Sequence, residues 1–233
     1  MDAVGCTWLD QKKFLKRLGQ QSRQFAVLCG SGISAGAGLP PAREFMTCVF
    51  DSYVGEKIRS KLLEAELPES VQLRFEGLLE VLQRTVDEDL ELVDLCYFVP
   101  DKGLRVPNEL HYYLAALSKT HPVVTPNFDI LIEEAMRRPP SHSDHSDWPA
   151  LVRVREKDWK RQQEAPSHGL WKIHGSIRVW DTVVSDWAPP GDVAPVVTLR
   201  SVSRTRRDEE RHRVFKAILE KYPLLVVGYF GGR

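Results

Sequence analysis

Side chains able to do chemistry gather in three short segments of this sequence, and each segment directly follows a run of apolar residues. The first is a loop with four glycines between Gly30 and Gly38, the second is Thr125-Pro126-Asn127-Phe128-Asp129, and the third is His174-Gly175-Ser176. Amide, carboxylate and imidazole groups orient substrates and transfer protons, and glycine-rich loops approach phosphates. We predict that the three segments converge on one bound nucleotide.

The glycine-rich loop follows the apolar run 25–29. Glycine adopts positive φ without strain and lets the backbone approach a ligand closely. The N–H groups of such a loop and of the helix after it bind anions. The spacing is G-x-G-x-x-x-G-x-G rather than the common G-x-G-x-x-G, and an ordinary tight loop between a strand and a helix is the alternative. The loop predicts a nucleotide site at the carboxyl end of the first strand.

The other two segments also have structural alternatives. Asn127 or Asp129 is well suited to cap the helix that follows, and His174 before a glycine is compatible with a hydrogen-bonded turn residue. In a parallel sheet, however, the carboxyl ends of neighbouring strands share one crevice. Helix caps do not require glycine and histidine motifs at other strand ends, so the combination favours a shared site.

Apolar periodicity predicts the elements that position these segments. The final strand, 223–228, is apolar on both faces and is expected to be buried in the sheet. A charged helical block over 56–97 is too long for a simple crossover, and we expect a helical insertion spanning about 56–118. The fold class is therefore α/β, with a Rossmann-like parallel sheet flanked by helices. The other expected elements are strands over 25–29, 121–124, 170–173 and 179–184, and helices over 8–19, 42–54, 128–138 and 203–221, with a further helix starting at Pro107.

Length and composition limit the class of protein. The 233 residues suffice for a single α/β domain, 1–233, and 32 basic residues balance 32 acidic ones, which argues against a nucleic-acid or membrane surface. No long apolar run or signal peptide is apparent. The four cysteines are scattered without a C-x-x-C pair, which argues against a cysteine zinc site and fits the cytoplasm.

Histidines and aspartates in the loop 139–149 offer a metal site, although a solvated loop is the better interpretation.

The final apolar strand bears on the length of the protein. An apolar parallel strand is normally followed by a covering element, so we expect the protein to continue beyond Arg233.

The order of these motifs resembles that of the sirtuins and their bacterial sirtuin-like relatives. The sirtuin run G-A-G-x-S, followed by G-I-P-x-F-R, is similar to 30–34 and to Gly38-Leu39-Pro40-Pro41-Ala42-Arg43. The sirtuin T-Q-N-I-D is similar to 125–129, and the catalytic H-G is similar to His174-Gly175. The resemblance spans about residues 25–230, and it implies NAD as the substrate.

Departures from the sirtuin pattern narrow the activity and the metal content that the resemblance implies. Deacylating sirtuins carry two zinc-binding cysteine pairs after the histidine motif, whereas this chain has no cysteine beyond Cys96, so no zinc is expected. Ala42 replaces the aromatic residue before the arginine, and Pro126 replaces the glutamine. The resemblance is therefore to the branch that hydrolyses NAD, often as effectors of bacterial anti-phage defence.

The resemblance also implies roles for individual residues. Asn127 would orient the nicotinamide ribose and the attacking water, Asp129 would bind the carboxamide or fix its loop, and His174 would act as general base. Gly228 would allow close approach at the adenosine end. The remaining residues expected at the dinucleotide are Gly30, Ser31, Gly32, Ile33, Ser34, Arg43 and Thr125.

The leading hypothesis is an NAD glycohydrolase that releases nicotinamide and ADP-ribose or its cyclic form. An NAD-dependent protein deacylase and a non-catalytic NAD or ADP-ribose sensor remain as alternatives. The resemblance further implies a homo-oligomer or a fused or partner regulatory domain that controls activity.

Overall fold

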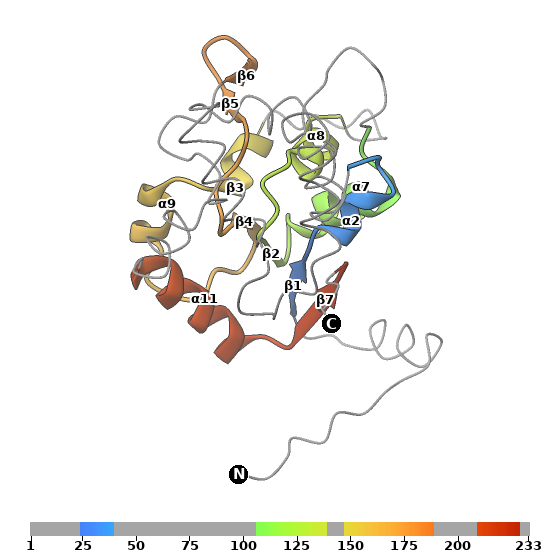
Figure 1. The fold of residues 1–233 in the computed structure, drawn as a ribbon. Helices are drawn as coiled ribbons and strands as arrows, with labels where there is room; N and C mark the ends of the chain where they lie inside the picture. Colours follow the sequence, from blue (N-terminus) through green and yellow to red (C-terminus); the bar gives the residue numbers. More distant parts are fainter. Residues whose placement is uncertain (1–23, 40–105, 139–146, 189–208, 229–233) are drawn as a thin grey trace, which may run out of the picture.

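The computed structural model describes residues 24–39, 106–138, 147–188 and 209–228, and their main feature is a five-stranded sheet. The strand order is β3-β4-β2-β1-β7, and every neighbouring pair is parallel (Figure 1). This arrangement confirms the predicted Rossmann-like α/β fold. The strands are β1 (Ala26–Cys29), β2 (Pro122–Thr125), β3 (Val152–Arg153), β4 (Gly169–Lys172) and β7 (Leu224–Val227).

Helices cover both faces of the sheet (Figure 1). On one side lie α7 (Glu109–Leu117) and α8 (Leu131–Arg137), and on the other lie α9 (Glu156–Arg161) and α11 (Glu209–Lys221). Alternate residues of each central strand enter separate apolar clusters. Val123 of β2, for example, packs in the α7 and α8 layer, whereas Val124 packs in the α9 and α11 layer. Two-sided burial is why these strands are continuous apolar runs.

The predicted strands and helices in the described residues occur close to their expected limits, with three differences. β7 pairs with β1 alone among the described strands, and Leu224 and Val226 are exposed to 38% and 51%. The expectation of a fully buried final strand is therefore wrong. β3 and α9 were not predicted, because β3 has only two residues and α9 is dominated by charged residues.

The expected strand over 179–184 is instead a hairpin of β5 (Val179–Asp181) and β6 (Asp186–Ala188). The Asp181 carboxylate accepts hydrogen bonds from the N–H groups of Val183 and Val184, which closes the turn. Such local side-chain bonds compete with an extended strand. Trp180 and Trp187 anchor the hairpin against Trp148, with ring centroids 5.4 and 5.9 Å from it.

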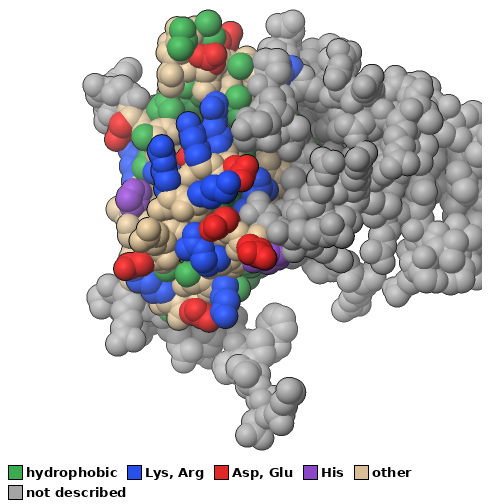
Figure 2. All heavy atoms as spheres, turned by 90° about the vertical axis from the view of Figure 1, so that its left-hand side faces the viewer, with side chains coloured by type: hydrophobic (Ala, Val, Ile, Leu, Met, Phe, Trp, Pro, Cys, Tyr) green, Lys and Arg blue, Asp and Glu red, His purple; other side chains and the backbone are tan. Residues whose placement is uncertain are grey.

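Charge is mixed on the face that carries α9 and α11. Figure 2 shows basic and acidic side chains interspersed there, and exposed ion pairs such as Lys160–Glu156 and Arg213–Glu210 neutralise one another. None of the helices in the described ranges is both long and apolar enough to cross a membrane. The predicted helices over 8–19 and 42–54, and most of the insertion over 56–118, lie outside the described residues.

Candidate active site

The three segments that carry the predicted site residues start side by side at the carboxyl ends of the strands. β1, β2 and β4 are neighbouring parallel strands. The Thr125 hydroxyl donates to the Cys29 carbonyl at 2.8 Å, and the Ile173 N–H donates to the Thr125 carbonyl at 3.0 Å. The glycine loop, the 125–129 segment and the His174 turn therefore leave the sheet from adjacent strand ends.

The glycine loop lies directly on β7 rather than presenting a ring of free donors. The N–H groups of Gly30 and Gly32 donate to the Val227 and Gly228 carbonyls at 3.0 and 2.9 Å, and those of Ile33 and Ser34 donate within the turn. Ser31 is exposed and Ile33 is buried. These four N–H groups are engaged inside the protein, so the geometry favours close backbone approach over a phosphate cradle built from them.

Gly228 is the glycine whose type the fold requires most clearly. Its φ is +63°, and a Cβ at this position would lie 2.6 Å from both the Ile33 N and the Ile33 Cγ2. Of the four loop glycines only Gly38, with φ 81°, adopts positive φ. The tight contact between the end of β7 and the glycine loop therefore accounts for Gly228 without any ligand.

A chain of hydrogen bonds links the glycine loop to the 125–129 segment. The Ser34 hydroxyl donates to Asp129 Oδ2 at 3.0 Å and lies 3.2 Å from His111 Nε2. His111 Nδ1 accepts from the Asn108 N–H at 3.1 Å. Because Nδ1 is the acceptor, the neutral ring carries its proton on Nε2 and donates to Ser34.

Burial supports this assignment of His111, whose side chain is fully inaccessible. Burial lowers the pKa of His111, while the Asp129 carboxylate opposes that shift. The neutral ring is therefore the form that the folded protein favours. The sequence analysis missed His111, although Asn108-x-x-His111 at a helix start was an available signal. The two residues form a reciprocal capping box at the first turn of α7.

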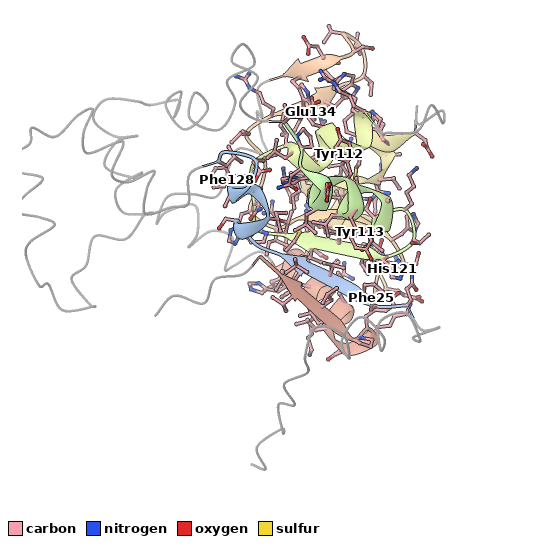
Figure 3. All side chains as sticks on the ribbon, turned by 90° about the vertical axis from the view of Figure 1, so that its right-hand side faces the viewer. Phe25, Tyr112, Tyr113, His121, Phe128 and Glu134 are labelled. Atoms are coloured by element: carbon pink, nitrogen blue, oxygen red, sulfur yellow. The ribbon has the colours of Figure 1, made fainter. Side chains whose placement is uncertain are left out.

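Both carboxylate oxygens of Asp129 accept hydrogen bonds from the protein. Its Oδ1 accepts from the Leu131 N–H at 3.1 Å, while Oδ2 accepts from Ser34, and the residue is 8% exposed. The N-cap of α8 is Ile130, with no side-chain cap bond, so Asp129 bonds the first helical N–H from one position before the cap. In Figure 3, Phe128 lies beside α2 (Gly32–Ala35) at this edge of the sheet, far from Phe25 and His121.

Asn127 differs from its neighbours because part of its side chain has no protein partner. Its N–H donates to the Thr125 hydroxyl at 3.0 Å, and the residue is 7% exposed. The side-chain nitrogen Nδ2 is buried, with no hydrogen-bond partner within the described part of the chain. A buried donor left in this state costs on the order of 1–3 kcal/mol. Three other buried side-chain atoms make no hydrogen bond within the described residues, Trp159 Nε1, Arg211 Nε and Tyr222 Oη. Asn127 alone of the four follows β2 in a segment predicted to carry the site.

His174 lies in the turn after β4 and is half-buried. The turn is tied to the 125–129 segment by the Ile177 N–H, which donates to the Phe128 carbonyl at 2.9 Å. Arg43 lies outside the described residues. Cys29, at the end of β1, is fully buried, and burial raises the pKa of its thiol to about 12. A buried thiol with a raised pKa is unsuited to nucleophilic chemistry.

The sequence analysis also missed a buried ion pair behind the site. Lys172 Nζ lies 2.6 Å from Glu133 Oε1, and both side chains are almost completely inaccessible. Within the ranges that the structure describes, no group of three or more His, Cys, Asp or Glu side chains is arranged to hold a metal ion. Most of the loop with the candidate metal ligands, 139–146, lies outside those ranges.

Comparison with known proteins confirms the resemblance to sirtuins for the second half of the chain. The family model of the SIR2-like domain matches residues 121–231, which run from the start of β2 to just past β7. The match does not separate the anti-phage branch from other members. A search of curated proteins found no match.

Solved sirtuin structures are similar to the chain at low identity. One from a study of sirtuin substrate affinity is 14% identical with a TM-score of 0.35, over 94% of this chain and 87% of that one. Sir2Tm bound to a propionylated peptide is 13% identical with a TM-score of 0.34, over 94% and 86%. Sir2 with a p53 peptide and NAD+ has the same values.

Proposed function

We propose that this chain, which is sirtuin-like over residues 121–231, binds NAD at the carboxyl edge of its sheet and hydrolyses the nicotinamide–ribose bond. The observation that carries the proposal is the buried amide nitrogen of Asn127, which has no partner in the described ranges and follows β2, the strand between β1 and β4. A ribose hydroxyl or a water held by the ligand would supply the missing acceptor. The pyrophosphate and adenosine would then extend toward Ser31 and the glycine loop.

The chemistry follows from the substrate. Nicotinamide in NAD is a cationic leaving group, so breaking its bond to the ribose C1′ sends the electron pair to the ring nitrogen and releases a neutral molecule. The ribosyl group gains oxocarbenium character, and a water oxygen then bonds to C1′. His174 would accept the proton of that water, because an imidazole titrates near neutral pH. Asn127 would hold the ribose and water in line.

The hydrogen bonds of Ser34 and Asp129 support these roles for Asn127 and His174. Ser34 and Asp129 use their polar atoms on one another, on His111 and on Leu131. In the proposal they therefore position the Asn127 loop rather than contact the substrate. Preorganised polar groups of this kind lower a barrier because they do not have to reorient during the reaction.

Nicotinamide release from NAD by the purified chain tests the proposal, with and without an acyl peptide. We expect release without peptide, and a loss on the order of 100-fold or more in Asn127→Ala and His174→Ala, with the thermal unfolding temperature preserved. His121→Ala, at the opposite end of the sheet, is the control and should keep its activity.

The alternatives give different results in the same assay. Release that requires the acyl peptide would identify a deacylase. NAD or ADP-ribose binding measured by calorimetry without release would identify a sensor. Full activity in both the Asn127 and His174 variants would overturn the residue assignments.

A further inference from the structure

The buried ammonium of Lys172 connects the two segments that carry the proposed catalytic side chains. Its Nζ lies 2.6 Å from the Asp129 carbonyl, 2.9 Å from the Ser176 Oγ and 2.6 Å from Glu133 Oε1. The Asp129 carbonyl belongs to the loop of Asn127, Ser176 belongs to the turn of His174, and Glu133 belongs to α8. One cationic group is thus shared by three separate segments.

The number of contacts matches the number of donors. An ammonium has three N–H donors, and the three close acceptors use all of them. The Phe128 carbonyl, at 3.5 Å, is a more distant fourth neighbour. Lys172 is completely buried and Glu133 is 3% exposed, so water does not supply these bonds. No other standard side chain of similar length donates three hydrogen bonds from a single nitrogen.

Fold stability is a weak reason for this arrangement. Removing two charges from water costs roughly what their attraction returns, and apolar replacements of buried ion pairs are often neutral or stabilising. Burial raises the pKa of Glu133, and the adjacent ammonium opposes that rise. Glu133 also balances the charge of Lys172, which would otherwise stand unpaired close to a site that develops positive charge on ribose.

We propose that Lys172 is a positioning residue for cleavage of the nicotinamide–ribose bond, an inference that rests on the proposed function. With Glu133 as its counterion, the ammonium holds the Asn127 loop and the His174 turn in their mutual arrangement. Backbone bonds between the same segments, from Ile173 to Thr125 and from Ile177 to Phe128, set the approximate spacing. The ammonium fixes what those bonds leave adjustable, namely the carbonyl of Asp129 and the hydroxyl of Ser176.

The test removes both charges together, so that no unpaired charge is buried. We compare Lys172→Met/Glu133→Leu with the parent chain by thermal unfolding, by the kcat and KM of nicotinamide release, and by hydrogen exchange. The expected result is an unfolding temperature within a few degrees of the parent, a fall in kcat of at least 50-fold and a KM within about threefold. Exchange should rise in 126–130 and 173–177 but not in β1 or α11.

One further variant keeps the inference testable if the double variant does not fold, and a second variant is the control. Ser176→Ala removes one acceptor of the ammonium and should lower kcat about tenfold, with faster exchange in 173–177. Lys216→Met makes the same change as Lys172→Met, at an ion pair with Glu220 exposed on α11, and should leave kcat and exchange unchanged.

The outcomes separate this inference from the function on which it rests. A parent chain that releases no nicotinamide overturns the proposed function. An active parent together with a folded double variant of parental kcat overturns the positioning role alone. The same applies if the double variant does not fold and Ser176→Ala keeps parental kcat.

Discussion

The two ends of the parallel sheet differ in how their polar groups are placed: Gln24 and His121 at the amino end are half-buried, whereas three charged side chains at the carboxyl end are buried. At the amino end, the Gln24 amide donates to the Thr120 and Ser167 carbonyls, and the His121 ring packs against Phe25 with the ring planes tilted by 43° and the centroids 4.4 Å apart. At the carboxyl end, Lys172, Glu133 and Asp129 bring charged side chains into the interior, and the side-chain amide nitrogen of Asn127 has no hydrogen-bond partner among the described residues. The amino-end contacts are hydrogen bonds of an uncharged amide and a tilted ring contact.

This contrast separates stability from function. Buried charges and orphaned donors cost free energy that a purely structural end of a sheet does not incur. The buried charges of Lys172, Glu133 and Asp129 lie at the carboxyl end, which is the end where the proposed function places the ligand. Changes to Asn127 or to the Lys172–Glu133 pair should alter activity more than stability, and changes to the amino-end contacts of His121 should do the reverse.

The largest expected effect comes from Asn127. Asn127→Ala should lower nicotinamide release on the order of 100-fold or more, because it removes the group that holds ribose and water. Chemical denaturation should show an unchanged or slightly higher free energy of unfolding, because the variant no longer buries an unpartnered donor. A large loss of stability with unchanged kcat would reverse the contrast between the two ends.

Gly228→Ala should destabilise the fold at the contact between β7 and the glycine loop. The added Cβ would lie 2.6 Å from Ile33 atoms in a positive-φ conformation, so we expect a loss of about 1–3 kcal/mol in the free energy of unfolding. Gly36→Ala is the matched control, because its Cβ would meet nothing closer than 3.5 Å. Equal stability of the two variants would contradict the close packing described for Gly228.

His111 should make stability depend on pH. Its pKa is lowered in the folded state, so as pH falls below about 6.5 the unfolded chain gains a proton that the folded chain resists. Stability is full above that pH and should decline toward the lower folded pKa, by at most about 1.4 kcal/mol per pH unit.

His111→Gln isolates the contribution of His111 to the pH dependence of stability, because glutamine retains a donor toward Ser34 without titrating. The pKa of His121 is also lowered by burial, so the measurement is the difference between the pH profiles of the parent and the variant. Parallel profiles would show that His111 does not titrate as described.

The smallest effect is expected at the amino end. His121→Ala removes the ring that packs against Phe25 and should cost about 1 kcal/mol in the free energy of unfolding, with no change in kcat. Urea denaturation and nicotinamide release measure the two quantities. A clear loss of kcat would show that the amino end also shapes the site.

Much of the architecture could be predicted from local pattern. β1, β2 and β4 are continuous apolar runs because both of their faces are buried, so their positions could be read directly from residue types. The hairpin was mistaken for a single strand, because its end depends on Asp181 accepting bonds from the next turn. The position of β7 at the end of the described strand order could not be predicted, since strand order depends on contacts between distant segments.

What the sequence by itself determined is the set of strands, the three chemistry-bearing segments that follow them, and the resemblance that these segments carry in order. Local periodicity and residue type suffice for that. Only the tertiary structure decided that the Ser34 hydroxyl bonds Asp129 and lies beside His111, and that the Asn127 side-chain nitrogen finds no partner in the part of the chain that the structure describes. It likewise decided that Lys172, a single lysine in an apolar strand, joins two loops. Hydrogen bonds between residues some 40 to 95 positions apart depend on strand order and register, which no local pattern encodes.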